Sequence, residues 1–126
     1  MTQIEQTCAS APDHAKCARL NDDCRWLRGD AGNFRHMMTI GVEDLISDAD
    51  LRSLIIRRAQ LQAAIRHYQF VPGDGTERDF GCFNFMGKRL FFKIDAYDRN
   101  LENGSPDPAD ASVTIRVMTV MLANEY

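Results

Sequence analysis

The 126-residue sequence lacks both a strong charge of one sign and a long hydrophobic run. Its 15 basic and 18 acidic residues leave a formal charge of −3. Proteins that bind nucleic acid generally through its phosphates usually carry a clear basic excess, so that class is disfavoured. A mimic of DNA would need a far larger acidic excess. No apolar stretch approaches the roughly 20 residues of a membrane-spanning helix, so we expect no membrane segment.

A secretion signal is also missing from the sequence. The opening MTQIEQTCASAPDH contains no basic segment followed by an apolar one, which is the pattern of a signal peptide. We therefore predict a cytoplasmic protein whose thiols stay reduced.

Cysteine pairs of the CxxC type are absent as well. The four cysteines are Cys8, Cys17, Cys24 and Cys82. The first three could join His14 in a zinc site, but structural zinc sites usually take ligands in tight pairs from two elements. None of the four has the histidine or helix-N-terminal setting of a nucleophilic thiol. We interpret most of them as small buried hydrophobes and predict no metal and no cofactor.

What is present is an ordinary globular composition, with 44% apolar and 26% charged residues. A chain of this length can form one core, and we predict a single domain over 12–126 behind a disordered tail at 1–11. Spaced apolar residues over 12–28, followed by a glycine, predict a first helix. Loose alternation over 34–40 predicts a short strand.

The clearest helical pattern runs from Ser47 to about Tyr68. Ser47 with Asp50 three residues later is typical of a helix start. The apolar stripe of this helix consists of Leu51, Leu54, Ile55, Leu61 and Ile65. Arg58 falls in the middle of the stripe. Its charge either reaches solvent or pairs with a buried acid, and Asp95 is then the candidate partner in a structural ion pair.

The run FGCFNF-MG-KRLFFKID predicts a β-hairpin that turns at Met86-Gly87 and pairs Phe83 with Leu90. The segment 112–123 is ambiguous, because its β-branched residues alternate for five residues and the alternation then fails. We predict a largely buried helix there. The expected order is α-β-α-β-β-α, an α+β fold with about three helices on one face of a small antiparallel sheet.

Two strings at the C-terminal end resemble a known family. KIDAYDRNLENGSPDPAD and the following TIRVMTVMLANEY are similar to the ending of small alphaproteobacterial proteins of unknown function, often carried on plasmids and other mobile elements. MTIGVEDL and DFGCFNFMGKRLFFKID are also similar, and the likeness spans roughly 18–126. Ala96 and Ala111 depart from the family pattern. No activity is attached to the family, so the resemblance implies only a context, an accessory gene of mobile DNA.

The acidic stretch 95–110 is the part of the sequence that most invites a chemical interpretation. Its carboxylates suit magnesium or calcium, but their spacing does not match an EF-hand loop. A metal-dependent enzyme that uses Asp79, Asp95 and Asp98 is one alternative. The three histidines accompany no recognisable nucleophile turn, so we predict no catalytic residue.

A protein-binding surface is the interpretation that we favour as a function for the acidic stretch, because interfaces combine a few aromatic or arginine anchors with a polar rim. The candidate residues are Asp95, Tyr97, Asp98, Arg99, Asp107 and Asp110. A structural explanation competes with it and accounts for these acids more simply: they serve as turn and cap residues, and Asp95 pairs with Arg58 or Arg116. The function would then lie elsewhere on the chain.

Basic residues on the long helix and at the hairpin turn support a different candidate, a small nucleic-acid-binding regulator. They are Arg52, Arg57, Arg66, His67, Lys88 and Arg89. We nevertheless expect an accessory protein that binds a host or element-encoded protein, for example to inhibit a restriction or CRISPR complex. The sequence leaves the identity of the partner and the oligomeric state open.

Overall fold

The computed structural model describes residues 13–29 and 33–126, and the tail predicted at 1–11 lies outside them. These residues form three α-helices and a four-stranded mixed sheet, which confirms the α+β prediction. The helices are α2 (His14–Trp26), α3 (Ile40–Ile46) and α4 (Leu51–Arg66). The strands are β1 (Phe34–Met38), β2 (Phe80–Phe85), β3 (Lys88–Tyr97) and β4 (Ile115–Leu122). Short 3₁₀ turns are η2 (Pro72–Asp74), η3 (Ala111–Val113) and η4 (Ala123–Glu125).

Helix α2 and strand β1 form where the sequence predicts them. The Asp13 side chain caps α2 by accepting a hydrogen bond from the Lys16 backbone N–H at 3.0 Å. Leu27 ends the helix in the left-handed conformation, with φ at 57°. Strand β1 stops at Met38, because the next residue, Thr39, already caps α3.

Helix α3 was not predicted, and its presence moves the start of the long helix. Ser47 lies at the C-terminal end of α3, so it does not begin α4. Asp50 caps α4 instead, accepting hydrogen bonds from the Arg52 backbone N–H and the Ser53 hydroxyl. The predicted N-cap at Ser47 is therefore wrong by one turn, because two acceptors compete there and Asp50 is the one used.

The β-hairpin is confirmed in position and register. Phe83 pairs with Leu90 across β2 and β3, as the alternation predicts. Met86 and Gly87 both have positive φ, 51° and 76°, which is the backbone of a two-residue turn that matches the twist of the strands.

The C-terminal segment corrects the prediction of a helix over 112–123, because β4 is a strand. It lies between β1 and β3 in the order β1-β4-β3-β2, parallel to β1 and antiparallel to β3. The sheet is therefore mixed and not antiparallel. A central strand covered on both faces loses the alternation that marks a half-exposed strand, which explains the error. Its buried residues, Ile115, Arg116, Met118, Val120 and Met121, come from both faces.

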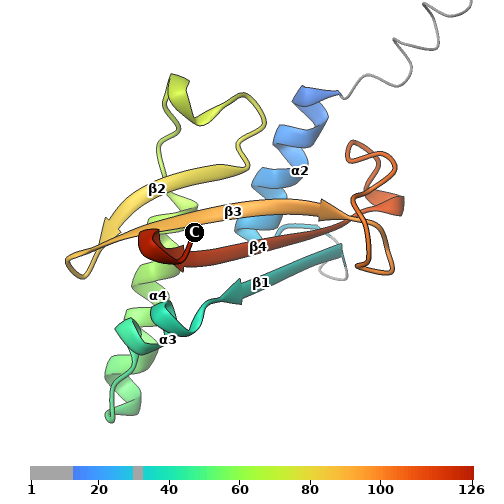
Figure 1. The fold of residues 1–126 in the computed structure, drawn as a ribbon. Helices are drawn as coiled ribbons and strands as arrows, with labels where there is room; N and C mark the ends of the chain where they lie inside the picture. The colour runs from blue at the N-terminus through green and yellow to red at the C-terminus, as the bar shows by residue number, and fades with distance from the viewer. Residues whose placement is uncertain (1–12, 30–32) are drawn as a thin grey trace, which may run out of the picture.

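The main core lies between the sheet and the helices, and Figure 1 shows α2 and α4 behind the sheet. Its central residues include Phe92, Leu90 and Val42, each fully buried. The C-terminus crosses the opposite face in Figure 1. There the Tyr126 ring lies edge-on to Phe91, with ring centres 5.5 Å apart. The second face of the sheet is thus partly covered by the end of the chain.

Close packing in the core yields a test at Gly81. A Cβ atom at this position would clash with the Phe92 ring and lie 2.9 Å from the Tyr68 ring. We expect Gly81→Ala to lower the free energy of unfolding by about 1–3 kcal/mol, measured by urea denaturation. Gly104→Ala is the matched control, because a Cβ atom added there would have no neighbour within 4 Å. Equal stability of the two variants would contradict this account of the core.

Candidate functional site

The acidic loop between β3 and β4 uses several of its carboxylates within itself. Asp98 accepts a hydrogen bond from the Glu102 backbone N–H at 3.1 Å. Asp107 accepts one from the Ala109 backbone N–H at 3.2 Å. These are turn contacts of the kind that the structural explanation expects.

Asp110 has the same kind of role at the end of the loop. Its side chain accepts from the Ser112 hydroxyl at 2.6 Å and from the Ser112 backbone N–H at 2.9 Å. These two bonds lower the pKa of the exposed Asp110 carboxyl. It caps the turn η3 rather than the α-helix that was predicted to follow.

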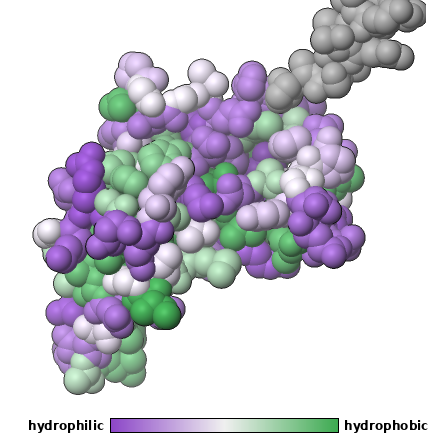
Figure 2. Space-filling model, in the orientation of Figure 1, coloured by the Kyte–Doolittle hydropathy of each residue, from purple (hydrophilic) through white to green (hydrophobic). Residues whose placement is uncertain are grey.

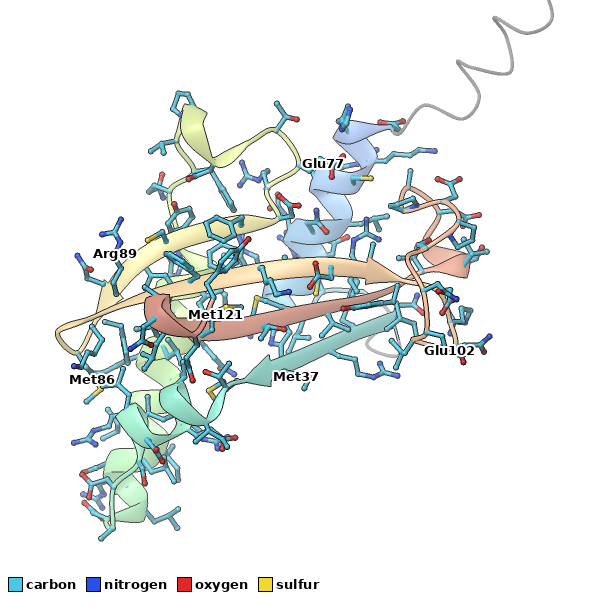
Figure 3. The ribbon with its side chains drawn as sticks, in the orientation of Figure 1. Met37, Glu77, Met86, Arg89, Glu102 and Met121 are labelled. Atoms are coloured by element: carbon cyan, nitrogen blue, oxygen red, sulfur yellow. The ribbon has the colours of Figure 1, made fainter. Side chains whose placement is uncertain are left out.

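Arg99 and Tyr97 connect the loop to the sheet. The Arg99 Nη1 atom donates to the Asn33 side-chain oxygen at 3.0 Å, next to the start of β1. Tyr97, half-buried at the end of β3, forms a backbone bridge with Gly104. Both residues therefore hold the loop in place, and Glu102 projects at its outer end in Figure 3.

The predicted ion pair between Arg58 and Asp95 does not form. Asp95 pairs with Lys93 at 2.9 Å, two residues earlier on the same strand. Arg116, the other candidate partner, donates to Asn21 and Pro108 instead. Alternation places Asp95 and Lys93 on the face of β3 opposite to the buried Phe92, whereas α4 packs on the Phe92 face. Arg58 is exposed on α4, so of the two interpretations offered for it, the exposed one is correct.

Arg116 is the buried cation beneath the acidic loop. Its side chain is 2% exposed, and it donates from Nε to the Asn21 side-chain oxygen at 2.7 Å and from Nη2 to the Pro108 carbonyl at 2.6 Å. Burial lowers the pKa of Arg116, while Cys17 and Cys24 raise it. One side chain of β4 therefore joins α2 to the loop.

Thr114, just before β4, closes the same loop through its hydroxyl. Its single hydroxyl hydrogen is shared between the Asp107 carbonyl oxygen, 3.0 Å away, and the Asp110 carbonyl oxygen, 2.8 Å away. Ser105 shares a further hydroxyl contact with it at 2.7 Å. Arg99, Thr114 and Arg116 therefore hold the loop through hydrogen bonds, and its carboxylates keep fixed positions.

The described thiols, Cys17, Cys24 and Cys82, do not gather into a metal site, and Cys8 lies outside the described residues. Within the described ranges, no group of three histidine, cysteine or acidic residues is placed to hold a metal ion. Burial raises the pKa of Cys24 to about 12, so its thiol stays protonated and weakly nucleophilic. His14 instead contacts Glu77 at 2.5 Å. Burial also raises the pKa of Asp79, and the charges of Glu77 and Asp95 raise it further. Asp79 lies beside β3, where its backbone carbonyl accepts from the Ile94 backbone N–H at 2.8 Å.

The basic residues of the nucleic-acid alternative do not form one continuous surface. Arg57 is tied to Asp48 at 3.1 Å near the start of α4. Arg66 and His67 lie at the opposite end of that helix. Arg89 lies on the hairpin, where Figure 3 labels it. A phosphate backbone could therefore not contact the whole set along one stripe.

A groove between β1 and α4 is a surface feature that the sequence did not predict. We call it the edge groove, because β1 is an outer strand of the sheet. Its volume is about 190 Å³. Its lining residues are His36, Met37, Met38, Arg58, Leu61, Gln62, Ile65, Met118 and Val120. The floor is apolar and belongs to the core, while Arg58 and Gln62 stand at the rim on the α4 side.

Large apolar side chains near the edge groove, on β1, α3 and α4, remain exposed. Met37 is 57% exposed, Ile40 74% and Ile55 58%. Leu51, Ile55, Arg58 and Gln62 are spaced by four, three and four residues, which places them along one side of α4. Figure 2 shows green hydrophobic surface among purple at the end of the molecule where α3 and α4 extend past the sheet. Such clusters mark interaction surfaces more often than scattered single residues do.

Comparison with known proteins places the chain in a family. A family model described as "Protein of unknown function (DUF3768)" matches residues 38–125. The chain belongs to this family. The DUF3768 match contains α3, α4, β2, β3 and β4, and it begins at the last residue of β1. No curated protein and no solved structure matches the chain. Among the described residues of this DUF3768 protein, no helix has the length and apolar character to cross a membrane.

The buried network leads to a test at Arg116. Arg116→Met should lower the free energy of unfolding by about 2–4 kcal/mol, because the Asn21 and Pro108 oxygens lose a charged donor in a buried setting. Limited proteolysis should at the same time cut faster within 98–110. Arg89→Met is the control, since Arg89 is exposed on β3. If both variants unfold at the same urea concentration, Arg116 does not hold the loop.

Proposed function

We propose that this protein is a protein-binding module and that the edge groove is where its partner docks. The observation that carries the proposal is the position of β1: an outer strand directly beside an apolar groove. A sheet edge offers a row of backbone donors and acceptors, and natural proteins usually cover, shorten or charge such edges. Strand β1 is short and carries the exposed Arg35, but the exposed apolar side chain of Met37 also lies on this edge.

The occupant that fits this surface is an extended segment of another protein, added as a fifth strand. Thr39 donates its backbone N–H to the Val120 carbonyl of β4 at 3.0 Å. Alternation along β1 then directs the N–H groups of His36 and Met38 away from β4, toward the open edge. A strand bound there would pair with these groups and place every second side chain over the groove.

The residues of the floor and rim indicate which side chains a bound segment would carry. Apolar side chains suit the floor formed by Leu61, Ile65 and Val120. Arg58 is exposed beside them and has no ion pair among the described residues, so an acidic residue next to the apolar one would complement it. The expected segment is therefore extended and apolar, with a carboxylate at its side.

The biological setting of the proposal follows from the likeness to small alphaproteobacterial proteins often carried on plasmids. In that setting the protein is an accessory factor of a mobile element that acts in the cytoplasm. The partner is then a host or element-encoded protein, and a restriction or CRISPR complex is the target class to examine first. The acidic loop remains a second surface through which Asp95, Tyr97 and Asp98 can contact a partner.

Substitution of Met37 tests the edge groove. Met37→Lys places a charge at the edge, and its 57% exposure means that the fold should tolerate the change. We expect a partner retained by the tagged protein in a pull-down from the native host to bind at least about tenfold more weakly to the variant. Met86→Lys is the matched control, because Met86 is a 44% exposed methionine at the hairpin turn (Figure 3) and outside the groove.

The pull-down is divided into nuclease-treated and untreated halves. A stoichiometric protein that survives nuclease, is lost with Met37→Lys and is kept with Met86→Lys supports docking at the edge groove. If both variants retain the partner protein equally, the edge-groove proposal is wrong, and the acidic loop is the next surface to test. Retention that disappears on nuclease treatment would favour the nucleic-acid alternative.

A further inference from the structure

A second hollow lies on a different side of the molecule, where the C-terminal ends of α2 and α4 meet the connection from α4 to β2. Figure 1 shows this connection, which carries η2, rising beside α2, and Figure 3 places Glu77 next to that helix. The hollow has a volume of about 430 Å³, within the range of small-ligand sites. Its lining residues are Asp22, Arg25, Trp26, Arg28, Arg66, His67, Tyr68, Gln69, Phe70 and Arg78. We call it the arginine pocket.

The arginine pocket has a charge opposite to that of the whole chain. Four arginines line it against a single acid, Asp22, in a protein whose formal charge is −3. Asp22 is already shared, because one of its oxygens accepts from Arg25 at 3.0 Å and from Arg78 at 2.9 Å. Arg28 lies 3.5 Å from Asp23 outside the lining, and Arg66 has no ion pair among the described residues. Positive charge is therefore in excess even when both acids are counted.

Arg25 forms the inner wall and is incompletely paired. Its side chain is 3% exposed, and its Nε and Nη1 atoms have no hydrogen-bond partner among the described residues. Buried donors of a charged group without acceptors are costly and rare in folded proteins. Burial lowers the pKa of Arg25, Asp22 raises it, and the nearby charges of Arg78 and Arg28 lower it further. An anion in the pocket would relieve this crowding of cations.

Aromatic rings hold the guanidinium groups at the wall. The Arg78 guanidinium lies 4.4 Å from the centre of the Phe70 ring, and that of Arg25 lies 5.0 Å from the same centre. Those of Arg28 and Arg66 lie 5.4 Å and 5.7 Å from the centre of the Trp26 ring. Stacked arginines lose less side-chain freedom when they bind an anion, and their planar fork matches phosphate oxygens.

We propose that the arginine pocket binds a phosphorylated small molecule through a diphosphate group. The pocket is larger than one phosphate requires, and a single phosphate would carry a charge of only about −1.5 to −2. A diphosphate brings enough negative charge and enough acceptor oxygens to engage Arg66, Arg78 and Arg28 together. This site is separate from the edge groove, since none of these three arginines lines that groove.

Arg66→Gln is the decisive variant. Arg66 has no ion pair to lose among the described residues, so the fold should survive the change. In isothermal titration calorimetry with inorganic pyrophosphate, we expect the dissociation constant to rise about tenfold or more, because a charged donor to phosphate is removed. Arg52→Gln is the matched control: the same change of charge, on the same helix, outside the pocket. Binding should also weaken as sodium chloride is raised.

Three further probes, compared with pyrophosphate, identify the source of the diphosphate. Adenosine diphosphate and pyrophosphate are compared with adenosine and with a single-stranded oligonucleotide. Equal binding of the first two shows that only the diphosphate is recognised, and tighter binding of adenosine diphosphate shows a nucleotide; either result supports the proposal. Binding of adenosine alone, preference for the oligonucleotide over pyrophosphate, equal weakening by Arg52→Gln and Arg66→Gln, or no pyrophosphate binding at millimolar concentration would each overturn it.

Discussion

The buried guanidinium of Arg116 is the interaction on which much of this structure depends. This group extends from the inner strand β4. It donates hydrogen bonds to an amide oxygen of α2 and to a carbonyl oxygen of the acidic loop. A charge removed from water is costly unless its donors are satisfied. The position of α2 and the path of the loop are therefore tied to one side chain. Thr114 adds a hydroxyl hydrogen that two carbonyl oxygens of the same loop share.

The same hydrogen bonds position one of the two surfaces that we consider functional. Because Asn21 fixes α2 against the sheet, Arg25, Trp26 and Arg28 at the far end of that helix meet Arg66 and Phe70. The arginine pocket is thus a consequence of how α2 docks. The edge groove arises from the topology instead, since β4 takes the central position and leaves β1 at the margin next to α4.

Prediction from sequence succeeded where neighbouring residues decide the conformation. The hairpin was predicted in register because Met86-Gly87 favours a tight turn and the flanking residues alternate. Helix α2 was found from its apolar spacing. The acids of the loop were offered as caps and turn residues, and Asp98, Asp107 and Asp110 form such contacts. The error at Ser47 was also local, since a second acceptor three residues later was the one used.

The sequence by itself determined the composition class, the hairpin and the two longer helices, because short-range propensity and periodicity suffice for them. Only the tertiary structure decided that 115–122 is a strand, since burial on both faces erases alternation and β4 needs β1 and β3 to complete its hydrogen bonds. It alone also gathered Arg25, Arg66 and Arg78 at one pocket. The pocket and the strand pairing join residues far apart in the chain, and no local pattern encodes which distant segments meet.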